Sequence, residues 1–193
     1  MKKIILASES PRRKQLLEQI GIDFEVVPSQ INEDEIINCD PFKNVQYLAL
    51  SKAQKIADKG HKGIIIGADT QVLIDSEIIG KPKDREDAKN ILIKLSGRRH
   101  NVITGVAILD TESKTSETWV ETTVVKFREL MIDEIEEYLD TEEYIGKAGA
   151  YGIQGRAAAF VERIEGCYFN VVGLPLAKLS AKLRMKQGSD KRI

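Results

Sequence analysis

The sequence predicts an α/β fold with one mixed, twisted sheet flanked by helices. Three observations lead to this prediction. Helical and strand-like patterns alternate along the whole chain. The continuous apolar run from Gly63 to Ala68 is typical of a central strand that is covered on both faces. Two later segments, Asn101 to Leu109 and Thr118 to Phe127, alternate like paired antiparallel strands. The 193 residues suit a single domain, residues 1–193, of one or two lobes.

The first elements follow from capping and periodicity signals. A short buried strand is expected over Lys3 to Ala7 and a second over Phe24 to Val27. A helix begins at Ser10-Pro11, because serine is a good N-cap and proline suits the first helical position, and it ends at Gly21. Asp40-Pro41 begins a second helix in the same way. The apolar stripe of this second helix consists of Val45, Leu48, Ala49, Ala53 and Ile56.

The later elements follow the same signals. In chain order they are a hairpin of Gln71 to Asp75 with Glu77 to Ile79, a helix from Asp84 through Leu95, an acidic helix over Ile132 to Leu139, a glycine-rich loop over Lys147 to Gly155, a strand over Ala159 to Ile164, and a helix over Leu176 to Met185. The tail from Lys186 to Ile193 is expected to be frayed. The aromatic residues, among them Phe127, Tyr138, Tyr144, Tyr151 and Phe160, are expected in the core rather than as a base-stacking set.

Composition excludes several classes of function. The net charge is −1, so no global basic field exists to hold nucleic acid. Two cysteines, Cys39 and Cys167, and two histidines, His61 and His100, make a structural zinc site unexpected. The cysteines are expected to be reduced thiols, and His100 to be structural. No apolar run approaches the roughly 18 residues of a membrane span, and the sequence is interpreted as a cytoplasmic protein.

The strongest chemical signal is the segment Leu6-Ala7-Ser8-Glu9-Ser10-Pro11-Arg12-Arg13. It is a strand, a tight polar turn and a helix N-terminus, which is a natural anion site. Arg12 and Arg13 lie in the first helical turn, where cations oppose the helix dipole at a cost of about 0.3–1 kcal/mol each. A bound anion such as a triphosphate explains them, and a solvated basic helix end is the alternative.

Four other residues are candidates with open alternatives. Lys52 falls on the apolar stripe of the second helix, where it either reaches a phosphate site or extends its amine to solvent. Asp69 follows the buried run and is either a general base or metal ligand, or the cap of a turn. Lys81 follows Gly80 on a restricted backbone before Pro82, where it is either held in place for a site or simply part of a plain turn. Glu33 either joins Asp69 at a divalent cation or belongs to a solvated acidic loop.

Together these segments resemble the Maf family of nucleotide pyrophosphatases. The resemblance covers the chain from Leu6 to Leu176 and is specific in order and spacing. The motifs that carry it are LASESPRR, ALSKA, GADTQV, GKP, LSGRRHNVITGV, KAGAYGIQG and NVVGLP. It implies an elongated sheet with a central cleft, related to the inosine-triphosphate pyrophosphatase architecture. It also implies a homodimer and a divalent cation, Mg²⁺ or Mn²⁺.

The resemblance implies roles for individual residues. Asp69 matches the catalytic base, and the residues that match phosphate-binding or conserved-motif positions are Ser8, Arg12, Arg13, Lys52 and Lys81. Glu33 matches the Glu of the family's usual VDE motif, which reads Ile31-Asn32-Glu33 here, and with Asp69 it is the candidate ligand of the divalent cation. Gln154 resembles the branch that acts on dTTP and UTP, in which Arg12, Thr70 and Gln154 are associated with substrate choice.

Two further functions stay open. The first is a nucleotide-binding regulator of cell division that does not turn nucleotides over. The second is a pyrophosphatase whose true substrates are modified nucleotides. A carboxylate pair beside a triphosphate favours hydrolysis, because a protein that only binds the nucleotide has no need of it. No nucleic-acid or membrane partner is expected.

Overall fold

In the computed structural model, residues 2–32 and 40–188 are described, and over them the strands form one sheet. The strands are β1 (Ile4–Leu6), β2 (Glu25–Val26), β3 (Ile64–Ile74), β4 (Glu77–Ile79), β5 (Arg99–Asp110), β6 (Thr115–Phe127) and β7 (Val161–Glu165). Within these residues the seven strands lie in the order β2-β1-β3-β5-β6-β7, with β4 paired to β3. Parallel pairs at β1 and antiparallel pairs at β4 and β7 make the sheet mixed, which confirms the predicted α/β class.

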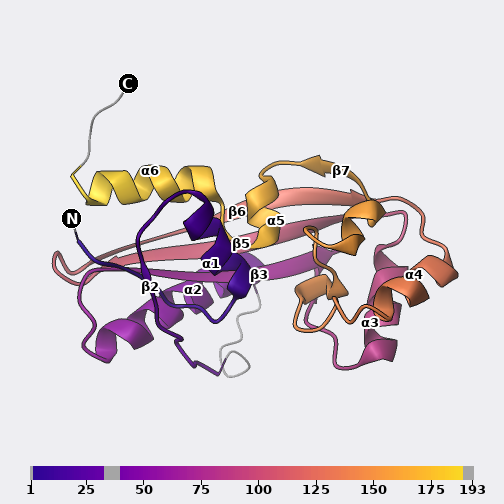
Figure 1. Cartoon of the computed structure of the whole chain (residues 1–193), viewed down its shortest axis with the longest axis horizontal. Coiled ribbons are helices and arrows are strands. Elements are labelled where there is room, and N and C mark those ends of the chain that lie inside the picture. Colours follow the sequence, from indigo (N-terminus) through magenta and orange to yellow (C-terminus); the bar gives the residue numbers. More distant parts are fainter. Residues whose placement is uncertain (1, 33–39, 189–193) are drawn as a thin grey trace. The chain divides into compact units, whose positions relative to one another are not determined.

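The helices lie between the strands in sequence (Figure 1). They are α1 (Pro11–Gln19), α2 (Pro41–Asp58), α3 (Arg85–Leu95), α4 (Ile132–Leu139), α5 (Tyr168–Val172) and α6 (Leu176–Lys186), with 3₁₀ turns η2 (Ala148–Ala150) and η3 (Arg156–Phe160). None of the helices in the described ranges has both the length and the apolar character needed to cross a bilayer.

The chain divides into two compact units. Unit 1 consists of Met1–Asp69, Thr104–Glu121 and Gly173–Ile193, and unit 2 of Thr70–Ile103 and Thr122–Val172. The long strands β3, β5 and β6 contribute residues to both units. Unit 1 is thus assembled from the beginning, the middle and the end of the sequence.

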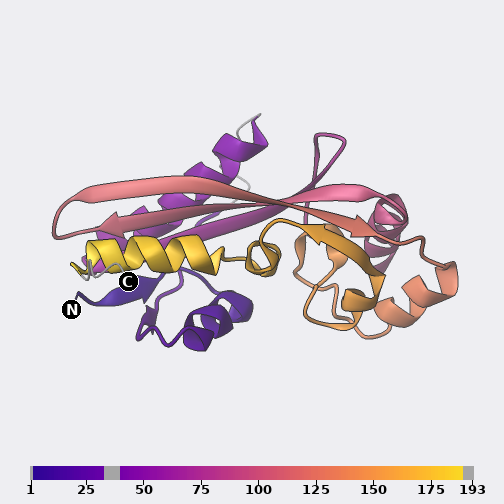
Figure 2. The same cartoon turned by 90° about the horizontal axis from the view of Figure 1, so that it is seen from above.

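In unit 1, helices cover both faces of the sheet. Figure 2 shows α2 on one face and α1 and α6 on the other. The core beneath α2 is apolar and consists of Ile5, Ala7, Ala49, Ala53, Ile56, Ile65, Ala107 and Leu109. On the opposite face, Leu16 and Leu17 of α1 are fully buried or nearly so. The predicted apolar stripe of α2 is therefore confirmed.

Two glycines let α2 lie directly on the strands of unit 1. A Cβ atom at Gly67 would lie 2.0 Å from the carbonyl oxygen of Ala49, and one at Gly105 would lie 2.2 Å from that of Val45. No side chain fits at either position, because real Cβ contacts are essentially never shorter than 3.0 Å. The close approach brings the side chain of Lys52, one turn after Ala49, down to β3.

Unit 2 has its own core of aromatic rings. Phe127 contacts Tyr151, Phe160 and His100 with ring centroids 4.8, 6.0 and 5.0 Å apart, and Tyr138 contacts Phe160 at 5.2 Å. All of these contacts are edge-to-face, an arrangement that aromatic pairs prefer. The prediction that Phe127, Tyr138, Tyr151 and Phe160 are core residues is confirmed, whereas Tyr144 is only half-buried.

Several predicted boundaries were wrong. The run Gly63 to Ala68 and the segment Gln71 to Asp75 are one strand, β3, because antiparallel pairing with β4 extends it to Ile74. The strand predicted from Ala159 begins at Val161, after the 3₁₀ turn η3. The short helix α5 was missed. Lys186 ends α6 rather than starting the tail, and residues 189–193 lie outside the described residues.

Candidate active site

The centre of the candidate site is a buried ion pair between α2 and β3. The Nζ atom of Lys52 lies 2.7 Å from Oδ1 of Asp69 and 3.4 Å from the carbonyl oxygen of Ala68. Both residues are only 6% exposed. A buried lysine and a buried carboxylate each require a partner, and here each supplies the other. The amine of Lys52 therefore does not extend to solvent but contacts Asp69 directly.

Asp69 was predicted to follow the end of a strand, but it lies inside β3. Its neighbour β1 pairs with β3 only as far as Leu6, opposite Ile66, with one more hydrogen bond from the Ala7 amide to the Ile66 carbonyl. The two strands are parallel, so Ser8 and Asp69 both lie just beyond the carboxyl end of this pairing. Ligands of α/β proteins bind at such edges.

Ser8 and Arg13 are joined by a hydrogen bond after β1. The Ser8 Oγ atom accepts from the Ser10 amide at 3.2 Å and from Arg13 Nη1 at 3.3 Å. A hydroxyl oxygen has two acceptor lone pairs. Because both are used here, the hydroxyl hydrogen is the group that Ser8 can offer to an anion.

The start of α1 is suited to an anion. Ser10 is the N-cap residue and Pro11 follows it, as predicted, but the Ser10 side chain makes no capping hydrogen bond. No acidic residue lies in the first turn of α1. By contrast, the N-cap Asp40 of α2 accepts hydrogen bonds from the amides of Phe42 and Lys43. Ser10 is therefore the N-cap by position, as predicted, but its side chain bonds none of the first amides, and the positive end of α1 keeps its attraction for a negative group.

The remaining predicted site residues, apart from Arg12, belong to unit 2 or lie outside the described residues. Thr70 follows Asp69 in β3 and is half-buried, while Lys81 and Gln154 are exposed. The Gly149 amide donates to the Gly80 carbonyl at 3.0 Å, which joins the segments that carry Lys81 and Gln154. Glu33 lies outside the described residues. Arg12, half-buried at the start of α1, belongs to unit 1.

The described residues contain no cluster of three or more His, Cys, Asp and Glu side chains placed to hold a metal ion. Asp69 is the carboxylate that the geometry offers. Mg²⁺ is commonly held by one or two carboxylates together with waters and substrate phosphates. A single buried carboxylate beyond the same end of the β1–β3 pairing as Ser8 fits this mode of binding.

A family model described as Maf-like protein matches residues 3–186. The chain belongs to the Maf family. Proteins named dTTP/UTP pyrophosphatase are similar to it over nearly their full length. Those of Ruminiclostridium cellulolyticum and Acetivibrio thermocellus are each 52% identical, with 95% of both chains covered. The one from Carboxydothermus hydrogenoformans is 47% identical, with 94% of this chain and 97% of the relative covered.

Among solved structures, the Maf chain is similar to the Staphylococcus aureus Ham1 protein. The TM-score is 0.48 and the identity 16%, over 65% of this chain and 72% of that one.

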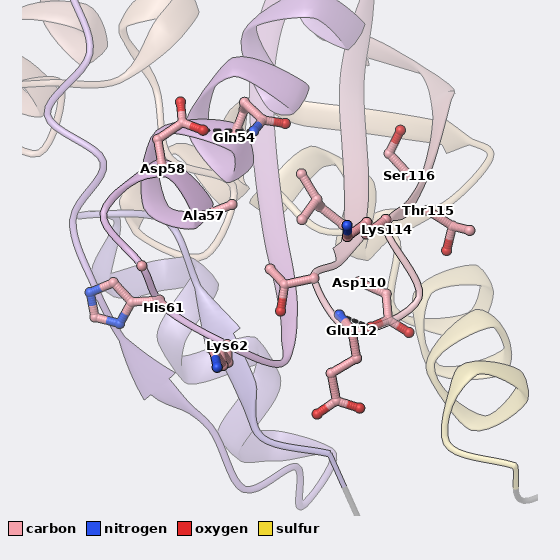
Figure 3. A pocket seen from close by; sticks show the side chains of 13 residues that line it. Gln54, Ala57, Asp58, His61, Lys62, Asp110, Glu112, Lys114, Thr115 and Ser116 are labelled. Atoms are coloured by element: carbon pink, nitrogen blue, oxygen red, sulfur yellow. Dashed lines mark hydrogen bonds between the residues drawn. The ribbon is translucent and has the colours of Figure 1, made fainter.

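A separate pocket of about 540 Å³ lies in unit 1 of this Maf chain, at the end of α2 and the turn between β5 and β6 (Figure 3). Its lining mixes charges of both signs, such as Asp58, Lys62 and Glu112, and most of these side chains are exposed. Among the predicted site residues that the structure describes, none lines it. We therefore do not assign the active site to this pocket, because the buried Lys52–Asp69 pair is not part of its lining.

His100 is part of the core of unit 2, as predicted. It is 2% exposed, and its Nε2 atom lies 2.8 Å from the hydroxyl of Tyr151. Burial lowers the pKa of His100 from 6.5 to about 4 and raises the pKa of Tyr151 above its usual value. The ring is therefore neutral at pH 7 and is not a proton carrier for the site.

This burial gives a testable pH dependence. Between about pH 6.5 and pH 4 the unfolded chain takes up a proton at position 100 that the folded chain does not, so the free energy of unfolding falls as the pH falls through this window. We expect the His100 ring signals in an NMR titration to change only near pH 4. A midpoint near pH 6.5 would contradict the burial argument.

Proposed function

We propose that this protein is a nucleoside triphosphate pyrophosphatase that hydrolyses dTTP and UTP to the monophosphate and pyrophosphate. The observation that carries the proposal is the buried Lys52–Asp69 pair, which lies beyond the same end of the β1–β3 pairing as the hydrogen-bonded Ser8 and Arg13. Membership of the Maf family supports it, as do relatives about 50% identical that are named dTTP/UTP pyrophosphatase.

The chemistry needs a base, a place for the triphosphate and neutralisation of charge. Asp69 takes a proton from water as the water oxygen bonds to the α-phosphorus. The bond between the α-phosphorus and the bridging oxygen breaks, and pyrophosphate leaves. Lys52 forms an ion pair with the Asp69 carboxylate and fixes its position. Ser8 donates its hydroxyl hydrogen to a phosphate oxygen, and Arg12 and Arg13 stabilise the negative charge of the phosphates.

A divalent cation, Mg²⁺ or Mn²⁺, would be held by Asp69 and the phosphates, and would neutralise phosphate charge and make the attacking water more acidic. Glu33 is proposed as a second ligand. Lys81 is proposed to bind phosphate, and Thr70 and Gln154, with Arg12, to select the base. We further propose that the protein is a cytoplasmic homodimer.

The test is a panel of nucleoside triphosphates, including methylated bases, incubated with the purified protein and Mg²⁺ or Mn²⁺. Release of pyrophosphate is measured for each nucleotide. We expect dTTP and UTP to give the highest kcat/KM. Nucleotide binding without release of pyrophosphate from any member of the panel would favour the regulator, and a preference for a methylated base would change the assigned substrate.

A further inference from the structure

The Arg13 side chain is held at two points that are far apart in sequence. Its Nη1 donates to Ser8 Oγ at 3.3 Å, and its Nε donates to the carbonyl oxygen of Gly173 at 3.1 Å. Gly173 lies 160 residues away and belongs to the NVVGLP segment, for which the proposed reaction gives no role. Ser8, Arg13 and Gly173 all belong to unit 1.

Gly173 has a backbone that favours glycine. Its φ is 131°, a value that residues with a Cβ atom rarely adopt. It is buried, and the next residue, Leu174, is fully buried. Pro175 then restricts the conformation of Leu174. The carbonyl of Gly173 therefore has a fixed direction, set by an unusual backbone angle and by buried residues that follow it.

We propose that Gly173 is a positioning residue for binding of the substrate phosphates, acting through Arg13. The inference rests on the proposed function. A guanidinium group is a planar fork, and its Nε–H and Nη1–H fix the plane when both are bonded to the protein. Arg13 then meets the phosphates in an orientation already set, so less rotamer freedom is lost on binding. The glycine of NVVGLP is present because only its backbone directs a carbonyl to Arg13.

The test is a double-mutant cycle with Gly173→Ala and Arg13→Ala. The probe is a dTTP analogue with an imido group between the α- and β-phosphorus atoms, whose binding is measured by calorimetry without turnover. We expect Gly173→Ala to weaken binding about tenfold in the wild-type background, as for a lost hydrogen bond to a charged group. In the Arg13→Ala background the same change is expected to weaken binding less than about twofold, because Gly173 acts only through Arg13.

The matched control is Gly60→Ala. Gly60 belongs to unit 1, has a φ of 88°, and leaves open space for a Cβ atom. It therefore reports the general effect of alanine at a left-handed position, and we expect it to bind the analogue as the wild type does. Equal effects of Gly173→Ala in the two backgrounds, or unchanged affinity in the single variant, would overturn the inference while leaving the proposed function intact.

A second variant covers the case in which Gly173→Ala does not fold. Arg13→Lys keeps the positive charge, but one ammonium group cannot reproduce the fixed fork. We expect it to bind the analogue about tenfold more weakly than the wild type. Wild-type affinity in Arg13→Lys would overturn the inference, since charge alone would then suffice. Wild-type protein that binds no triphosphate at all would overturn the proposed function as well.

Discussion

Replacing Asp69 with asparagine is expected to lower kcat by about 10²–10⁴-fold, the usual contribution of a general base. Asparagine has nearly the same shape, and its amide oxygen can still accept the hydrogen bond that Lys52 Nζ makes to Asp69 Oδ1 at 2.7 Å. It cannot take a proton from water, however. Affinity for the imido analogue, measured by calorimetry in the absence of metal, should stay within about threefold of the wild type.

Asp110→Asn is the matched control for this prediction. Asp110 is also a buried carboxylate of unit 1 that is paired with a lysine, at 2.6 Å from Lys2 Nζ. Its substitution should lower stability without lowering kcat. Near-normal turnover by Asp69→Asn, or an equal loss in Asp110→Asn, would contradict the role of Asp69 as the base.

Replacing Lys52 with methionine is expected to lower the free energy of unfolding by about 3–5 kcal/mol, because it leaves a buried carboxylate without its counterion. Methionine fills a similar volume, so the loss reports charge rather than packing. Turnover should fall as well, since Asp69 would no longer be held in place. Stability is measured by urea denaturation of Lys52→Met and of the double variant Lys52→Met with Asp69→Asn.

The double variant Lys52→Met with Asp69→Asn separates charge from shape. With both charges gone, most of the lost stability should return, while the activity should not. If the double variant is no more stable than Lys52→Met alone, the destabilisation does not arise from the unpaired Asp69 charge.

Helices with a clear N-cap or a clear apolar periodicity were predicted well from the sequence. Asp40-Pro41 and Asp84 gave the starts of α2 and α3, and the acidic helix Ile132–Leu139 was predicted at its observed bounds. Errors arose where pairing between strands decided the outcome. β3 runs unbroken from Ile64 to Ile74 and also pairs with β5, a strand from later in the chain that no local pattern around Asp69 contains.

The residues of the candidate site were proposed from the sequence, but the contacts between them were not. The place of Lys52 on an apolar stripe indicates a buried amine that needs a negative partner. The place of Asp69 after a buried run indicates a buried carboxylate that needs a positive partner. Their direct pairing could have been proposed from these two signals together. The contact of Arg13 with the Gly173 carbonyl could not have been predicted, because every residue has a backbone carbonyl and the two residues are 160 positions apart.

The assembly of unit 1 from three separate stretches has a consequence for biosynthesis. During synthesis Ser8, Arg13, Lys52 and Asp69 are made more than 100 residues before the Gly173 carbonyl and α6. Contacts between such distant segments close large loops and form slowly. Arg13 therefore gains its hydrogen bond to the Gly173 carbonyl only after residue 173 has been made, and a chain stalled before that residue would carry Asp69 and Lys52 without this contact.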